Sequence, residues 1–342
     1  MRGTMRRTPA LALPLALLAA AVAACGPRAR SAAPAPAADA ADAAGPELFG
    51  EGVFSTGAWD FFVAFTPDQR TAYFCRADGR FSYFTILLSR QRGDGGWGEP
   101  EVAPFSGRWS DADPHISPDG RRLFWISNRP LPGTPPPADT ARGDYDIWYV
   151  EHAADGAWGE PRHVGAPVSA PGATEWSPSV AANGNLYFGT VRPGGRGGND
   201  LYVARLVGGT YAEPESLGDS INTRGGEVEP WVAPDESYLI FSGQARPGSV
   251  GGFDLFVSRR VNGAWQAAVP LGGGVNSPAG DFNQSVSPDG RWLYFSSTRG
   301  RFDRVPDAPL GYAELQRRLT GVGNGLGDIY RVEMSRLGIP GR

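Results

Sequence analysis

Acidic side chains recur at one fixed position along this chain. Five short turns, centred on residues 67, 118, 182, 234 and 288, are each preceded by an acid seven residues earlier: Asp60, Asp111, Glu175, Glu227 and Asp281. We call these five residues the strand-start acids. Two further acids, Asp113 and Glu229, follow two residues after two of them. Carboxylates gathered around one point bind a cation such as Ca²⁺, which takes six to eight oxygens, or a cationic side chain of a partner.

The same recurrence also fits a purely structural role. An acid repeated in every copy of a repeat can accept backbone N–H groups of a neighbouring turn, which maintains the fold and binds nothing. Both interpretations stay open at this point. Like charges that lie close together disfavour one another's ionised forms, so an empty ring of acids needs a cation, an Arg or backbone donors to compensate.

A second set of acids suggests ion pairs. Asp residues begin an apolar run in four copies of the repeat, and an Arg closes the preceding aromatic run in the same copies. We expect four ion pairs within the repeats, Asp146 with Arg129, Asp200 with Arg192, Asp254 with Arg246, and Asp328 with Arg299. The first copy has Thr85 where the Asp belongs, and we expect it to deviate.

Enzyme signatures are mostly missing from the sequence. It contains no Gly-x-Ser-x-Gly elbow, no His-Glu-x-x-His and no Walker loop. The three histidines, His115, His152 and His163, are not spaced as a metal site. Glycan hydrolysis by a pair of channel carboxylates is the enzymatic alternative, and it requires unlike environments for the two acids. The equivalent repetition of the strand-start acids argues against such a pair, so we favour a protein without catalytic activity and predict no catalytic residues.

The elements that position these residues form an internal repeat. The turn anchors are 51, 64, 52 and 54 residues apart, and most read Pro-Asp or Pro-Asp-Gly. Each is flanked by an apolar residue two positions earlier and followed by aromatic strands such as Leu123–Trp125, Leu186–Phe188 and Leu293–Phe295. A motif such as Trp97-Gly-Glu-Pro100 marks a fourth strand. Four strands per period of about 50 residues predict an all-β fold, a β-propeller of five blades of four antiparallel strands, with six blades as the alternative.

The Pro-Asp-Gly turn and the Asp-Ile-Trp or Asp-Leu-Tyr strand resemble the Pro-Asp variant of the WD-repeat blade found in TolB-like propellers. The resemblance covers roughly residues 47–335 and implies the architecture. The third copy departs from it, with Ala182-Asn183-Gly184 in place of Pro-Asp-Gly. A sixth blade and an additional N-terminal domain, which TolB possesses, are not visible in this chain.

The ends of the repeat and its long loops lead to two more expectations. The last copy lacks a fourth strand, so residues 46–52 should pair with it and close the ring. Loops between second and third strands should lie on the same face as the strand-start acids, and the long ones are residues 130–143 and 300–327. In the second loop, Asp307 and Pro309 could start a helix that presents Tyr312, Leu315 and Leu319.

The N-terminus is typical of an exported lipoprotein. Basic residues precede an apolar run, and Val22-Ala-Ala-Cys25 resembles a lipobox. We therefore expect a lipoprotein signal peptide at 1–24, a lipidated Cys25 and a disordered Ala/Pro-rich tether at 25–46, and a TolB-like propeller at 47–342. The expected location is the cell envelope, with a lipid anchor and most simply in the outer membrane facing the periplasm.

Charge narrows the range of partners. Removal of residues 1–24 leaves 29 basic residues, all Arg, against 36 acidic ones, a net charge near −7, so nucleic acid is not an expected partner. We expect an interaction module for envelope proteins or cell-wall glycan, attached to the membrane by its lipid. A cation or sugar bound at the acidic channel mouth is the alternative, and Ca²⁺ is the one cofactor that we consider.

Overall fold

The computed structural model describes residues 45–131, 133–134, 144–153, 156–170 and 172–339. The expected signal peptide, Cys25 and most of the tether lie outside these residues, as does most of the 130–143 loop. All of the described residues belong to one compact unit.

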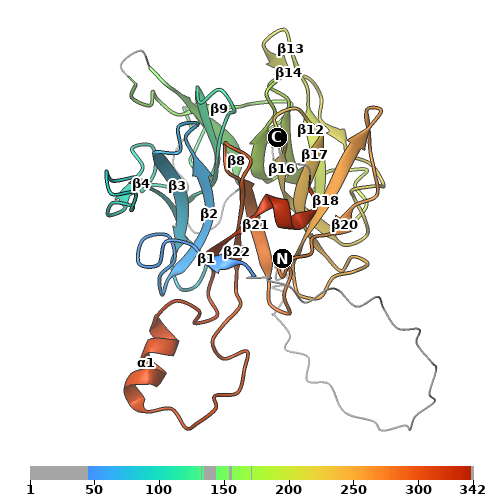
Figure 1. The fold of residues 1–342 in the computed structure, drawn as a ribbon. Helices are drawn as coiled ribbons and strands as arrows, with labels where there is room; N and C mark the ends of the chain where they lie inside the picture. Colours follow the sequence, from blue (N-terminus) through green and yellow to red (C-terminus); the bar gives the residue numbers. More distant parts are fainter. Residues whose placement is uncertain (1–44, 132, 135–143, 154–155, 171, 340–342) are drawn as a thin grey trace, which may run out of the picture. The chain divides into compact units, whose positions relative to one another are not determined.

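The described unit is a β-propeller of five blades (Figure 1). Blade 1 contains β2 (Trp59–Phe65), β3 (Thr71–Ala77), β4 (Phe84–Arg90) and β5 (Glu101–Val102). Blade 2 contains β6 (Asp111–Ile116), β7 (Arg122–Ser127), β8 (Asp146–Glu151) and β9 (Arg162–His163). Blade 3 contains β10 (Glu175–Val180), β11 (Leu186–Thr190), β12 (Asp200–Ala204) and β15 (Glu215–Ser216), and a small hairpin of β13 (Leu206–Val207) and β14 (Thr210–Tyr211) follows β12.

The last two blades complete the ring. Blade 4 contains β16 (Gly226–Val232), β17 (Tyr238–Gln244), β18 (Asp254–Val261), β19 (Ala264–Trp265) and β20 (Val269–Pro270). Blade 5 contains β21 (Asp281–Val286), β22 (Trp292–Ser297), β23 (Asp328–Glu333) and β1 (Glu47–Leu48), with the 3₁₀ helix η1 (Met334–Leu337) after β23. All pairings within the blades are antiparallel. The prediction of five blades is therefore confirmed.

The N-terminal strand closes the propeller as predicted. Strand β1 pairs with β23, with Glu47 opposite Arg331 and Leu48 opposite Tyr330. The next residue, Phe49, donates its backbone N–H to Ile329 O at 2.8 Å and is buried. Its ring contacts those of Phe54 and Tyr294, with centroid distances of 4.7 and 4.9 Å. Closure thus joins the first and last strands of the unit through hydrogen bonds and an aromatic cluster, and removes an open sheet edge.

The fourth strands lie later than the sequence motif indicates. Strands β5 and β9 begin immediately after the prolines of the two Trp-Gly-Glu-Pro motifs, while Trp97 and Trp158 form only isolated bridges. Proline has no N–H to donate to a ladder, so continuous pairing begins beyond it. The Trp-Gly-Glu-Pro motif therefore precedes the fourth strand in the sequence and is not part of it.

The first strands of neighbouring blades contact one another all the way round, from β2 through β6, β10 and β16 to β21 and back to β2. They therefore surround the axis of the propeller. The second-to-third loop of blade 5 contains α1 (Tyr312–Thr320), which lies in the separate loop at the lower left of Figure 1. The expected helix is present, but it begins at Tyr312 after Gly311 and not at Asp307 or Pro309.

The base of that loop packs against the start of blade 1. Asn324 donates to Gly57 O at 3.1 Å, and Asp60 donates its backbone N–H to Gly327 O at 2.9 Å. A Cβ added at Gly327 would lie 2.9 Å from the Trp59 ring, so the close approach requires glycine. The 300–327 loop therefore lies on the same face as the strand-start acids, as expected.

Candidate functional site

The five strand-start acids lie inside the protein, each with an arginine. All five side chains are fully buried, and each carboxylate contacts an Arg of its own blade. The ion-pair distances are 2.6 Å for Asp60 with Arg76, 2.8 Å for Asp111 with Arg129, 3.1 Å for Glu175 with Arg192, 2.6 Å for Glu227 with Arg246 and 2.7 Å for Asp281 with Arg299. These charges are therefore balanced within each blade, as buried ions require.

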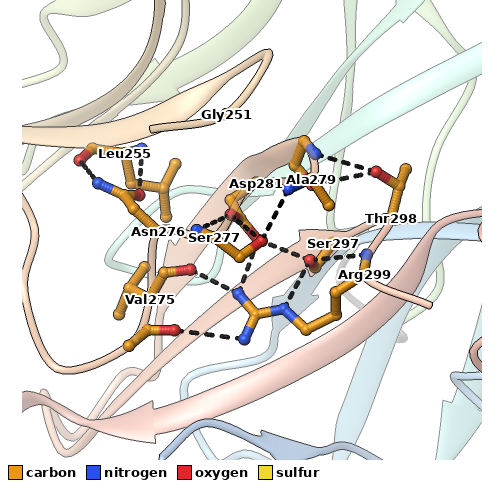
Figure 2. A network of polar contacts seen from close by, with 12 residues as sticks. Gly251, Leu255, Val275, Asn276, Ser277, Ala279, Asp281, Ser297, Thr298 and Arg299 are labelled. Atoms are coloured by element: carbon orange, nitrogen blue, oxygen red, sulfur yellow. Dashed lines mark hydrogen bonds and ion pairs between the residues drawn. The ribbon is translucent and has the colours of Figure 1, made fainter. Parts of the chain in front are cut away.

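The same arginines also bind the loop that leads into each first strand. Around Asp281, Arg299 lies between the carboxylate and the backbone oxygen of Val275, which accepts at 2.6 Å (Figure 2). Ser277 donates both its N–H and its hydroxyl to Asp281 Oδ2, at 2.6 and 2.8 Å. Thr56, Ser106 and Thr223 supply comparable hydroxyl donors in blades 1, 2 and 4. These contacts describe a fold-maintaining network repeated once per blade.

Glu175 departs from this pattern. Four and five residues before the acid, where the other blades have the hydroxyl donor, blade 3 has Pro171 and Ala170. Oε2 of Glu175 is buried without a hydrogen bond from any described residue. Burial raises the pKa of Glu175 to about 7, although Arg192 acts in the opposite direction. Blade 3 thus carries the least well satisfied of the five networks.

The expected ion pairs of the third strands are wrong. The arginines Arg129, Arg192, Arg246 and Arg299 bind the strand-start acids instead, as given above. The third-strand acids turn toward their own loops: Asp200 accepts from the Arg196 N–H at 2.5 Å, Asp254 from those of Val250 and Gly251 at 2.9 and 3.1 Å, and Asp328 from that of Gly323 at 2.7 Å. Asp146 lies 3.5 Å from His163 Nε2. Asp200, Asp254 and Asp328 each accept loop N–H groups through one carboxylate oxygen, while the longer Arg reaches across to the first strand.

Blade 1 deviates from the other four blades in the position of its arginine. Its arginine, Arg76, lies directly opposite Asp60 in the β2–β3 register, whereas Arg129 lies two residues beyond the partner of Asp111. Its side chain is 31% exposed, compared with 8% for Arg129. The ion pair of blade 1 is therefore the one most open to solvent.

Two positions after each strand-start acid lies a residue whose amino-acid type differs between the blades. Every first strand contains a β-bulge at this point, and the residue two positions after the acid has a positive φ between 49° and 58°. We call these the bulge residues: Phe62, Asp113, Ser177, Glu229 and Asn283. A left-handed backbone is unfavourable for non-glycine residues and is enriched at functional sites. All five blades share the β-bulge and the positive φ, but the side chains at this position differ.

Four of the bulge residues line a pocket of about 390 Å³ at the centre of the propeller, which we call the axial pocket. Its wall is dominated by seven aromatic residues from first strands, blade 1 and second-to-third loops, namely Trp59, Phe61, Phe81, Phe84, Trp176, Phe253 and Phe282. Phe81 contacts Trp59 and Phe84, with centroid distances of 4.9 and 4.8 Å. A concave, largely aromatic cavity with a few polar groups is the usual form of a small-ligand site.

The polar part of the axial pocket is formed by Asp113 and Glu229. The Ser177 hydroxyl donates to Asp113 Oδ2 at 2.6 Å. Glu229 Oε2 accepts from the Ser242 hydroxyl at 2.6 Å and from the Asn283 N–H at 2.7 Å. Burial raises the pKa of Asp113 to about 6 and that of Glu229 to about 7, and the charge of Asp113 contributes to the rise at Glu229.

These two carboxylates lack what the strand-start acids have. In the described part of the chain, neither Asp113 nor Glu229 forms an ion pair, and no Arg or His is among the residues that line the pocket. Asn199 also lines the pocket, and its buried Oδ1 receives no hydrogen bond from a described residue. The axial pocket therefore combines negative charge without a counter-ion and an acceptor without a donor.

A second cavity of about 380 Å³ lies at the turns of the repeat, lined by Pro67, Pro118, Pro234 and Pro288 together with Trp231, Tyr238 and Asp235. His115 also contributes to it, and its Nε2 accepts the Val180 N–H at 2.9 Å. Burial lowers the pKa of His115 to about 4, so the ring is neutral at physiological pH. This histidine joins two blades and provides no charge.

The described residues contain no group of three or more His, Cys, Asp or Glu side chains arranged to hold a metal ion. No helix among them is long and apolar enough to cross a membrane.

The sequence pointed to Asp113 and Glu229, but it grouped them with five acids that do not line the axial pocket. It gave no weight to the aromatic wall or to Asn199. The available signal was the break in the repeat: two positions after each acid, the residue type changes from blade to blade. In this protein the shared acids form ion pairs within their blades, whereas four of the bulge residues, which differ in type, line the axial pocket.

Comparisons with known proteins give only distant structural similarities. No family model and no curated protein sequence matches this chain. Among solved structures, it is similar to an α-L-arabinofuranosidase from Lactobacillus brevis (10% identity, 83% of this chain and 92% of the other, TM-score 0.44) and to the catalytic domain of a GH62 α-L-arabinofuranosidase from Coprinopsis cinerea (10%, 84% and 93%, TM-score 0.43). It is also similar to a protein of unknown function from Dyadobacter fermentans (14%, 75% and 79%, TM-score 0.42). At these identities and TM-scores, the similarities carry no argument about this chain.

Proposed function

We propose that this chain is a non-catalytic binding module of the bacterial cell envelope, anchored by a lipid on Cys25, whose ligand binds in the axial pocket. The observation that carries the binding function is the axial pocket itself, where Asp113 and Glu229 lie among aromatic side chains without a counter-ion. The lipid anchor, the outer-membrane location and the TolB-like type of the repeat rest on the sequence patterns described above. Envelope proteins and cell-wall glycan are the proposed partners.

The anchor and the binding site are tested separately. For the anchor, cells producing wild type or Cys25→Ser are labelled with a fatty-acid analogue and fractionated. We expect the label and outer-membrane recovery for wild type only. A labelled Cys25→Ser protein, or an unlabelled wild type, would refute the anchor.

For the site, ligands extracted from envelopes are identified by mass spectrometry after retention on the purified protein. Asp235→Asn alters the second cavity, at the turns of the repeat, which we call the opposite cavity. We expect wild type and this variant to retain the same ligand. The variants Glu229→Gln and Trp176→Leu should lose it, because both residues line the axial pocket. Equal retention by all four proteins would refute binding in that pocket. Adding Ca²⁺ to each protein during a thermal melt also tests the cation alternative, since a ligand that binds only the folded state raises the melting temperature.

A glycan-active enzyme is the second candidate, favoured by one specific observation. The repetition that argues against a catalytic pair applies to the strand-start acids, whereas Asp113 and Glu229 occur in two blades only and have different hydrogen-bond partners. A carboxyl group with a pKa near 7, such as that of Glu229, suits a general acid. Incubation with a panel of polysaccharides and aryl glycosides tests this candidate: product release that is lost in Glu229→Gln would support it and would refute the non-catalytic proposal.

A further inference from the structure

We propose that the axial pocket selects an organic cation, a protonated amine or a guanidinium group attached to an apolar body. This inference rests on the proposed binding function of the pocket and adds the chemical class of the ligand. It is argued from charge balance, from hydrogen-bonding capacity and from the nature of the wall.

Charge balance is the first argument. Each of the five strand-start acids has an arginine within 3.1 Å. The first-strand carboxylates that maintain the fold are therefore all neutralised within the protein. Asp113 and Glu229, on the same strands and two residues further on, are the exceptions among the described first-strand acids. The buried third-strand acids Asp200, Asp254 and Asp328 also lack an arginine, but they accept N–H groups of their own loops. A buried carboxylate without a counter-ion is costly, and a ligand that brings a positive charge removes that cost.

Hydrogen-bonding capacity is the second argument. The internal network uses Oε2 of Glu229, and no hydrogen bond from a described residue reaches Oε1. Asn199, which also lines the pocket, has a buried Oδ1 that receives no hydrogen bond from a described residue. These oxygens lack N–H or O–H donors. Ammonium and guanidinium groups supply such donors and have no acceptor of their own that would need a partner.

The aromatic wall is the third argument. Seven aromatic side chains line the pocket, and aromatic faces attract organic cations more strongly as water is excluded. They also provide the surface against which an apolar body would pack. A neutral sugar would gain from stacking as well, but it brings no positive charge to balance Asp113 and Glu229. A volume of about 390 Å³ suits a small amine or one side chain of a peptide.

The charge state of the pocket follows from its surroundings. Near Asp113, burial raises the pKa of the Cys75 thiol well above its usual range, and His115 is neutral because burial lowers its pKa to about 4. Asp111 is already paired with Arg129. Glu229 faces Ser242 of β17 and Asn283 of β21, which carry no charge. Cation affinity should therefore follow the ionisation of Asp113 and Glu229, rising from about pH 5.5 to about pH 8.

The test is calorimetric titration of the mature, full-length protein with matched probes. Phenethylamine is compared with the neutral 2-phenylethanol, and an acetylated Phe-Arg amide with its citrulline counterpart, so that a free amine and a peptide side chain are distinguished. Neutral monosaccharides form the third arm. We expect at least one cation to bind roughly tenfold or more tightly than its neutral partner, with affinity rising with pH.

Variants locate the effect. Glu229→Gln and Asp113→Asn should each weaken cation binding by about tenfold or more, whereas Asp235→Asn, which removes a charge from the opposite cavity, should leave it unchanged. Glu229→Gln should also abolish the pH dependence attributed to Glu229. Circular dichroism of each variant verifies that it is folded, and Phe253→Leu tests the wall without altering charge.

The outcomes separate the two proposals. If neutral probes or sugars bind as well as the cations and the pocket variants weaken them, the binding function stands and the cation inference is wrong. If only Asp235→Asn loses binding, the ligand site lies at the opposite cavity and both proposals are wrong. If no cation binds at millimolar concentration, the cation inference is overturned.

Discussion

The buried ion pair of blade 4 allows the structural role of the strand-start acids to be tested quantitatively. Arg246 is 5% exposed and lies 2.6 Å from the fully buried Glu227. Its guanidinium also contacts the Ile221 carbonyl and lies 5.0 Å from the ring centroids of Phe241 and Phe256. Arg246→Met would leave Glu227 buried with only the Thr223 donors. Removing one partner of such a pair costs about 3–5 kcal/mol of unfolding free energy.

The equivalent pair of blade 1 is the matched control. Arg76 is 31% exposed, so water can partly hydrate Asp60 after Arg76→Met, and the loss should be only about 1–2 kcal/mol. Replacing both partners in blade 4, as Glu227→Leu with Arg246→Met, should recover most of the loss, because no uncompensated charge remains.

Urea unfolding followed by tryptophan fluorescence measures these differences, and thermal melts provide a second readout. At roughly 2 °C per kcal/mol for a domain of this size, Arg246→Met should melt about 6–10 °C below wild type. The argument fails if Arg246→Met loses less than about 1 kcal/mol, if Arg76→Met loses as much as Arg246→Met, or if the blade 4 double variant is no more stable than Arg246→Met.

Three further predictions concern closure, pH and reactivity. Phe49→Ala should cost about 3–5 kcal/mol by unfolding titration, because it leaves a cavity in the aromatic cluster that closes the ring, and a loss near zero would show that closure does not depend on this contact. Burial raises the pKa of Glu229 to about 7, so the folded state favours its neutral form and loses stability as pH rises from about 4.5 to 7. Glu229→Gln should therefore gain on wild type by on the order of 1–3 kcal/mol across that range, and parallel stability curves would contradict the reasoning. Cys75 is fully buried and its thiol pKa is raised, so it should react with a thiol reagent only at the rate of unfolding, and rapid modification of the native protein would be inconsistent with the structure.

Much of the architecture was predictable because it depends on local, repeated chemistry. In the turn at Pro118, the Ser117 hydroxyl donates to Asp119, which also accepts the Arg121 N–H, and Gly120 has a positive φ of 72°. Such bonds join residues that are neighbours in sequence, so the motif itself reports the turn. The missing fourth strand of the last blade likewise indicated closure by the N-terminal strand.

The partners of charged side chains were less predictable. Arg129 could be assigned to Asp146 or to Asp111 by position alone, and the assignment to Asp146 was wrong. The choice depends on which group finds other donors: Asp200 and Asp254 accept N–H groups of their loops, which leaves the arginines to the strand-start acids and to loop carbonyls. Competition of this kind is settled only when all the groups are placed in space.

By itself, the sequence determined the number of blades, the position of the ring closure and the face that carries the 300–327 loop, because each follows from a period and from short-range turn chemistry. Only the tertiary structure separated Asp113 and Glu229 from the five acids that they resemble. The physical reason is the bulge in each first strand: it gives the residue two positions after the acid a left-handed backbone, and two of these residues place carboxylates in an aromatic pocket without an arginine.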